Sequence, residues 1–445
     1  MPQTATTTPA ATTTTAAGVV VAVCGTSRPD AERDSLDAAA QSYVKLALAL
    51  GDRDSDSLDS YHGPPAWQVE AHTKHSTLAQ IRASAAAFAG ALASPLPRSA
   101  TARVAGEDDA VRRGFLIRQL NAITARVDVL QGARYTFADE MRLLFQMEPA
   151  DASPIDGRSD EGASDRSLDR VRGQLDRLLP GRGELSRRYA AFDRQFIVPP
   201  DRIGAVLSRA IDGCRTATRA HVALPAGERV NIVYVRDSPW SAFTRYEGHF
   251  VSRVTVNTGF ALTVDRTLDL ACHETYPGHH AIASWLETRE GGRRPELLVQ
   301  LLFSPQTGLH EAAASLAPAL AFPDEARLAF ERDQLFPLAG LNPDGAPRYV
   351  AVARLVDEFH RVEADIVRRY VDGALDFPRA AAALERQALV PSADAMLKFV
   401  NQFRSYAATY TIGRDRLSHV VDRDWTSYVR TVTDAAQTLP LPNRR

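Results

Sequence analysis

The chain has 445 residues, of which 45% are hydrophobic, so it is long enough for two or three domains or for one large enzyme. Its formal net charge is −2 and its acidic and basic residues are interspersed, so we expect neither a nucleic-acid partner nor an anionic membrane partner. The sequence contains no Walker loop, no Rossmann glycine pattern and no G-x-S-x-G elbow. No stretch approaches the roughly 20 apolar residues that span a bilayer, and nothing indicates an oligomeric state.

The beginning of the chain, residues 1–27, is predicted to be a disordered tail because most of it is Thr, Ala and Pro. A short apolar run at 18–24 fails as a secretory signal, since no Lys or Arg precedes it. As a lipoprotein signal the run is weakened by Val23, where a small residue is expected before the modified Cys24. A cytoplasmic location is therefore expected, with export left open.

Two larger regions follow the tail. Residues 28–200 are predicted to form an N-terminal helical region, and residues 201–445 a catalytic region with C-terminal helices; Pro199 and Pro200 mark the boundary. Near the start of the second region, residues 231–238 and 249–258 are rich in β-branched and aromatic residues, which predicts two strands.

The cysteines are few and far apart. Cys24, Cys214 and Cys272 are widely separated, which argues against a disulfide framework and fits a reducing compartment. Cys272 directly precedes a histidine and could in principle bind a metal as a thiolate, but a small buried hydrophobic side chain is the favoured role.

The stretch Ala271–Ala281 concentrates histidines around one carboxylate. His273, Glu274, His279 and His280 resemble the zincin pattern H-E-x-x-H, in which two histidines one helical turn apart bind zinc and the glutamate is a general base. In an unbroken helix His279 would lie roughly 120° around from His273, and His280 would lie about 10 Å further along the axis. However, Pro277 and Gly278 are predicted to break the helix. We therefore expect His279 to be the second ligand, with His280 as the alternate.

A third ligand should come from further along the chain. Glu311 is the candidate, because it is predicted to open a helix of small residues, and His310 is a competing donor. The alternative for Glu311 is an ordinary carboxylate in the first turn of a helix, where the helix dipole favours it.

At these residues the chain resembles the widespread bacterial family called domain of unknown function 885, which is grouped with the zincin-like metallopeptidases. Besides the HETYPGHH stretch, the resemblance rests on Glu311, although Ala312 replaces the glycine that follows it in the family, and on three further segments: Tyr61–Trp67, Val256–Thr258 and Tyr410–Arg414. It implies that His273, His279 and Glu311 hold a metal. It also implies that an edge strand ahead of the metal-binding helix pairs with an extended substrate.

One pair of residues near the end of the chain is linked to chemistry both by this resemblance and by spacing. Tyr410 and Arg414 lie four residues apart and can face the same way on a helix, where either could stabilise an oxyanion. The alternative is an aromatic core residue followed by a surface arginine.

These features predict a mainly α fold (α-dominated α+β) resembling a zincin-like helical metallohydrolase. A small sheet should lie beside the metal-binding helix, and the active site should lie in a cleft between the N-terminal helices and the catalytic half. The expected function is metal-dependent hydrolysis of a peptide or small amide substrate, with Zn²⁺ as the metal and Glu274 as the general base. Fe²⁺ or another divalent transition metal is the alternative. Two alternatives stay open: a metal-dependent enzyme that acts oxidatively or as a lyase on a small metabolite, and a non-enzymatic helical binding protein with a structural metal site.

Overall fold

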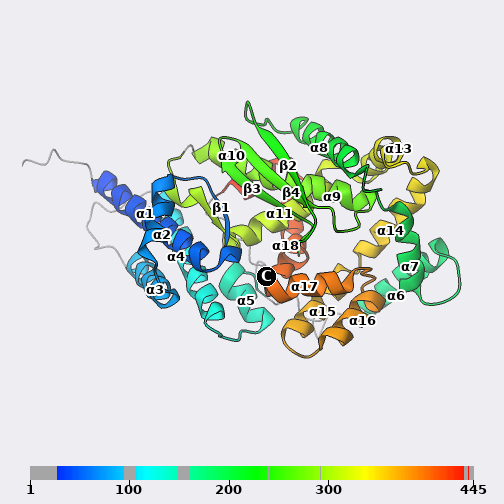
Figure 1. The fold of residues 1–445 in the computed structure, drawn as a ribbon, viewed down its shortest axis with the longest axis horizontal. Helices are drawn as coiled ribbons and strands as arrows, with labels where there is room; N and C mark the ends of the chain where they lie inside the picture. Colours follow the sequence, from blue (N-terminus) through cyan, green and yellow to red (C-terminus); the bar gives the residue numbers. More distant parts are fainter. Residues whose placement is uncertain are drawn as a thin grey trace, which may run out of the picture.

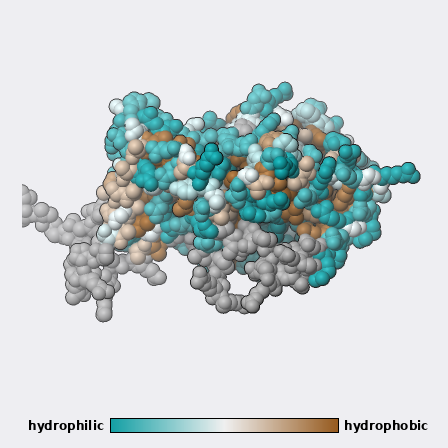
Figure 2. Space-filling view, turned by 90° about the horizontal axis from the view of Figure 1, so that it is seen from below, coloured by the Kyte–Doolittle hydropathy of each residue, from teal (hydrophilic) through white to brown (hydrophobic). Residues whose placement is uncertain are grey.

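The computed structural model describes residues 28–94, 107–148, 161–238, 240–290, 292–434 and 439. The expected tail at 1–27, which includes Cys24, lies outside these ranges. The described chain is mainly helical with two small sheets, which confirms the α-dominated α+β class (Figure 1). Seen from below, hydrophilic side chains cover most of the described surface (Figure 2).

The helices are α1 (Arg28–Arg53), α2 (Pro65–Lys74), α3 (Leu78–Ala93), α4 (Glu107–Leu130), α5 (Phe137–Phe145), α6 (Glu161–Leu178), α7 (Leu185–Asp193), α8 (Ile203–Arg219), α9 (Val264–Glu274), α10 (His279–Glu290), α11 (Pro305–Ala321), α12 (Asp324–Phe330), α13 (Phe336–Ala339), α14 (Ala346–Asp357), α15 (His360–Val371), α16 (Phe377–Gln387), α17 (Ala393–Phe403), α18 (Ile412–Val421) and α19 (Trp425–Thr433). The strands are β1 (Leu58–Tyr61), β2 (Arg229–Val235), β3 (Ala242–Gly248), β4 (Val251–Asn257) and β5 (Val299–Leu301).

Helices α1 to α4 pack around a core of their own at the blue end of the molecule (Figure 1). The apolar side chains of α4 recur every three or four residues and are buried there, as in Leu116, Leu120 and Ile123. Strand β1 leaves this group of helices and pairs antiparallel with β5, whose Val299 and Leu301 join the same core. The pairing brings the N-terminal region against the region that follows residue 200.

The second core is larger and runs from α5 to the end of the described chain. Helices α5, α6 and α7 contribute to it, although they precede the boundary expected at Pro199 and Pro200. Side chains from both sides of residue 200 thus share one core. The division of the chain into two regions at that residue stays a prediction.

The three-stranded sheet has the order β2-β4-β3, with β2 parallel and β3 antiparallel to β4. The two predicted strands are confirmed as β2 and β4, whereas β3 was not predicted. Side chains on one face of the sheet, such as Val254 and Tyr246, are buried, while Arg245 and Arg253 on the opposite face are exposed. Strand β4, the nearest strand before α9, is central, and the two edges of the sheet are β2 and β3. The expected pairing of an edge strand with the substrate stays a prediction.

The cysteine expectation is wrong. Cys214 of α8 and Cys272 of α9 form a disulfide across two helices that pack side by side. Cys272 is buried as expected, but as half of a cross-link rather than as a free hydrophobic side chain. The two cysteines are separated by 58 positions in the sequence, and they come into contact only because α8 packs on α9. Within the described ranges, no helix is long and apolar enough to cross a membrane.

Candidate metal centre and its cavity

The helix break predicted at Pro277 and Gly278 is present. Helix α9 ends at Glu274, the Tyr276–Pro277 peptide bond is cis, and α10 begins at His279. Gly278 passes so close to α9 that a Cβ atom there would lie 1.8 Å from the carbonyl oxygen of His273, so only glycine fits. The Gly278 amide donates instead to the carbonyl of Cys272 at 3.1 Å. The break thus turns α10 back so that His279 approaches His273.

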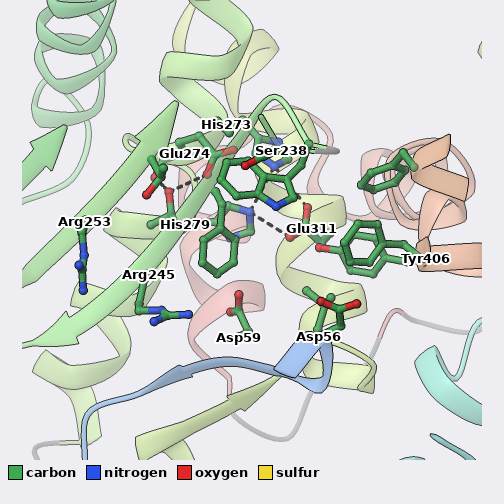
Figure 3. Close-up of a pocket in the computed structure, with 18 of the residues that line it drawn as sticks. Asp56, Asp59, Ser238, Arg245, Arg253, His273, Glu274, His279, Glu311 and Tyr406 are labelled. Atoms are coloured by element: carbon green, nitrogen blue, oxygen red, sulfur yellow. Dashed lines mark hydrogen bonds and ion pairs between the residues drawn. The ribbon is translucent and has the colours of Figure 1, made fainter. Parts of the chain in front are cut away.

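Three side chains converge at this break, and we call them the ligand triad: His273, His279 and Glu311. The Nε2 atoms of the two histidines lie 3.2 Å apart, and they lie 3.3 Å and 3.1 Å from the carboxylate oxygens of Glu311 (Figure 3). Ligands bound about 2.0–2.2 Å from a tetrahedral zinc ion are themselves about 3.3–3.6 Å apart. The observed separations are close to this range, so the donor set fits a transition metal ion.

Glu311 comes from α11 but does not open that helix, which begins at Pro305. It therefore lies beyond the first turn, and the alternative of a carboxylate favoured by the helix dipole does not apply. Burial tends to raise the pKa of Glu311, but the neighbouring charges of His279 and His273 lower it. Burial conversely tends to lower the pKa of His279, and Glu311 raises it to about 9. Glu311 and His279 therefore stabilise each other's charged forms.

The two competing histidines lie elsewhere. His280 is completely buried, with Nδ1 2.8 Å from the Ser252 hydroxyl and Nε2 3.2 Å from the Glu228 carboxylate. His310 does not belong to the ligand triad, and burial together with the charge of His279 lowers its pKa to about 3. The alternate ligand His280 instead belongs to a polar group behind α10, where Glu228 also accepts hydrogen bonds from Tyr276 and Arg215.

Glu274 lies beside the triad and is held by the sheet. It is the last residue of α9 and is buried, and its Oε2 accepts a 2.6 Å hydrogen bond from the hydroxyl of Thr244 on β3. Both Glu274 and the triad open onto one cavity of about 510 Å³. Residues of the segment 55–59, in and just before β1, line this cavity from the N-terminal region, and the three-stranded sheet with α9, α10, α11 and α17 lines it from the region after residue 200. The cleft was expected against the N-terminal helices, but β1 and the residues just before it form that wall instead.

Of the two residues proposed near the end of the chain, only Tyr410 reaches the cavity. Its ring centroid is 5.9 Å from that of His273, and Tyr406, which the sequence did not single out, packs against it at 5.6 Å. Burial, together with the charge of Glu311, raises the pKa of both hydroxyls well above the ordinary value. Arg414 does not line the cavity, and its guanidinium donates to Asp357 at 2.9 and 3.3 Å. The structure therefore does not bring Arg414 to the cavity with Tyr410.

Sequence reasoning also missed the charged walls of the cavity. Asp59 comes from β1, where the pairing with β5 shifts register between Leu58 and Ser60, so Asp59 is the extra residue of a bulge. Burial raises the pKa of its carboxyl to about 7, although the charges of His279 and Arg245 oppose that rise. Arg245 and Arg253 line the cavity from the sheet (Figure 3). None of these three belongs to a motif.

Two buried polar side chains hold segments of the site in place. The Asn257 amide donates to the carbonyls of Ser238 and Trp240, two cavity residues, at 2.7 and 3.1 Å. The hydroxyl of Tyr428 on α19 contacts the carbonyls of Pro277 and Ala313 at 3.1 and 3.2 Å. Tyr428 thereby links the α9–α10 break to α11, the two segments that carry the triad.

Comparison with known proteins does not assign a family. No family model matches the chain, and no curated protein matches it. Among solved structures, the chain is similar to a candidate lipoprotein from Colwellia psychrerythraea, with 13% identity over 84% of this chain and 71% of that chain and a TM-score of 0.47. A candidate lipoprotein of unknown function from Shewanella oneidensis matches with 12% identity over 84% and 74% of the two chains and a TM-score of 0.42. The resemblance to domain of unknown function 885 stays an expectation.

Proposed function

We propose that the protein is a metal-dependent hydrolase that cleaves a peptide or amide bond. The observation that carries the proposal is the convergence of the ligand triad, at separations suited to a tetrahedral ion, beside a carboxylate that is not a ligand. His273, His279 and Glu311 would hold the ion. When bound, zinc acidifies water and polarises a carbonyl oxygen, which lets hydrolysis proceed near neutral pH.

Side chains of the protein would carry out the proton transfers and stabilise the oxyanion. Glu274 takes a proton from the attacking water as the water oxygen adds to the carbonyl carbon, and it returns a proton to the nitrogen when the C–N bond breaks. Thr244 orients Glu274 for both transfers. The hydroxyls of Tyr406 and Tyr410 are the donors available on the opposite side of the triad to stabilise the oxyanion.

The two histidines and one carboxylate of the ligand triad also fit a second candidate function. Two histidines and one carboxylate also form the ligand set of non-heme Fe²⁺ enzymes, which act oxidatively on small molecules. Hydrolysis ranks first because the buried Glu274 beside the triad has the position of a general base. A purely structural metal ranks last, since the side chains of His273 and His279 remain 16% and 14% exposed, whereas structural zinc sites are closed by four protein ligands.

The disulfide gives information about the compartment in which the protein is located. Disulfides persist in oxidising compartments and are rare in the cytoplasm. The Cys214–Cys272 cross-link therefore supports a location outside the cytoplasm in place of the cytoplasmic location first expected.

The test begins with metal content. Protein purified without chelator or affinity nickel should contain about one transition metal ion per chain, and it should hydrolyse members of a peptide mixture in a reaction that chelator abolishes and zinc restores. Absence of a stoichiometric metal would overturn the proposal. Iron as the bound metal, together with O₂ uptake in place of hydrolysis, would establish the second candidate.

A further inference from the structure

Two arginines face each other on the open side of the sheet. Arg245 of β3 and Arg253 of β4 are directly opposite in the antiparallel register, and both line the cavity. Like charges in opposite positions of a sheet destabilise it. A negatively charged group beside the two guanidinium groups would offset this repulsion. The described part of the protein places such a group in an ion pair with only one of the two arginines.

That arginine is Arg253, which forms an ion pair with Glu247 at 2.6 Å. Arg245 forms no ion pair within the described part of the chain, and its guanidinium lies 5.7 Å from the ring centroid of Phe243. Figure 3 shows the Arg245 side chain extending from β3 into the cavity, toward Asp59 and the space below His279. Its charge is thus directed at the volume that a substrate would occupy.

The position of Arg245 along β3 places this charge close to the expected chemistry. Thr244 precedes it and holds Glu274, and successive side chains of a strand point to opposite faces. Thr244 therefore points toward α9 and Arg245 points away from it, and both residues line the cavity with Glu274. A group bound by Arg245 thus lies in the same cavity as the bond next to Glu274.

Three acidic side chains also line the cavity near the two histidines of the triad. Asp59 faces the cavity from β1, and Glu274 and Glu311 lie on the helical side. An anionic substrate would be repelled by these carboxylates unless a cation received it. A guanidinium presents two parallel N–H groups that match the two oxygens of a carboxylate.

We propose that Arg245, supported by Arg253, binds a carboxylate of the substrate. The substrate class is short peptides or N-acyl amino acids with a free terminal carboxylate. The position of the cleaved bond rests on the proposed function, but the carboxylate site itself does not. A terminal carboxylate lies on the leaving-group side, so the protein would remove residues from a carboxyl end.

The test measures binding and turnover separately. Binding is measured by calorimetry in zinc-loaded Glu274→Gln protein, with N-acetyl-Ala-Ala as the free acid, the same peptide as its amide, and N-acetyl-Ala-Asp amide. The free acid should bind roughly 10- to 100-fold more tightly than its amide, the range for a hydrogen-bonded charge pair. Adding Arg245→Gln should remove this difference by weakening the acid alone. Adding Arg229→Gln, at an exposed arginine of β2 that does not line the cavity, should leave it intact.

The outcomes separate the two proposals. Equal affinity for acid and amide, no binding of any ligand, or a preference that survives Arg245→Gln would overturn the carboxylate site. Binding of the Asp amide as tightly as the free acid would overturn the terminal position and assign the site to acidic side chains. In wild-type protein, hydrolysis of the amide as fast as the acid would overturn the carboxylate preference while leaving the hydrolase proposal standing. No hydrolysis with the binding preference intact would overturn the hydrolase proposal alone.

Discussion

The hydroxyl of Thr244 lies 2.6 Å from Oε2 of Glu274 and 3.0 Å from the same residue's carbonyl oxygen. A β3 side chain thus fixes both the end of α9 and the carboxylate proposed as the general base. Replacing Thr244 by Val keeps the volume and removes the donor. We expect about a tenfold loss of kcat with unchanged metal content, because one hydrogen bond to a charged group is lost. Thr288→Val is the matched control, since that hydroxyl bonds only to Ser284 within α10. Equal losses in both variants would mean that Thr244 does not position Glu274.

Glu274 and Glu311 should respond differently to the same change. Glu274→Gln keeps the shape but removes the basic carboxylate, so hydrolysis should fall by about 10²–10⁴-fold while metal content stays near one per chain. Glu311→Gln removes a proposed ligand, so metal affinity itself should fall and excess zinc should restore part of the activity. Elemental analysis and turnover at increasing zinc would check both. If Glu274→Gln lost metal and Glu311→Gln kept it, the two roles would be inverted.

The neighbouring histidines provide a matched pair. His279→Ala should lose the metal, because its Nε2 lies 3.1 Å from Glu311 and 3.2 Å from Nε2 of His273. His280→Ala should keep the metal but lower the free energy of unfolding, because the buried Ser252 hydroxyl loses its partner and Glu228 loses one of its hydrogen bonds. Metal titration combined with urea unfolding separates the two effects. Loss of metal only in His280→Ala would contradict the geometry of the triad.

The tyrosines and Arg414 can be separated in the same way. Tyr406→Phe and Tyr410→Phe each remove one hydroxyl from the cavity, and the variant that loses an oxyanion donor should lose about 10²-fold in kcat with little change in KM. Arg414→Gln should keep its turnover, because its guanidinium is engaged with Asp357 outside the cavity. Steady-state kinetics on one verified substrate would decide. Full turnover in both tyrosine variants would assign them to packing.

The disulfide should contribute to stability. A cross-link that closes a loop of 58 residues is expected to stabilise the folded state by about 4 kcal/mol in the chain-entropy model. A Cys214→Ala, Cys272→Ala double variant should therefore unfold at lower denaturant. Reductant should lower the stability of the wild-type protein and leave that of the double variant unchanged. Identical unfolding curves with and without reductant would mean that the bond does not form in solution.

The sequence was informative where the chemistry was local. Pro277 and Gly278 signal a helix break through their own backbone properties, and this signal placed His279 beside His273 without knowledge of the fold. Strands β2 and β4 could also be predicted from the sequence, because they contain many apolar residues. Strand β3 was not, because Arg245 and Glu247 on its open face interrupt the apolar pattern.

The sequence was misleading where distant segments meet. The four-residue spacing of Tyr410 and Arg414 suggested one helix, but α18 begins only at Ile412, so the two side chains diverge. The partners Cys214 and Cys272 become neighbours only when α8 packs on α9. Asp59 faces the cavity because of a bulge, and that bulge depends on a strand far along the chain.

The pairing of β1 with β5 also affects the order in which parts of the structure form during folding. The triad spans a short stretch from His273 to Glu311, whereas Tyr61 pairs with Val299 across more than half of the chain. Closing a long loop costs more conformational entropy than closing a short one, and contacts between distant residues form slowly. We therefore expect the ligand triad, together with Arg245 of β3, to assemble before β1 pairs with β5. The wall that contains Asp59 is then the last part of the cavity to form during folding.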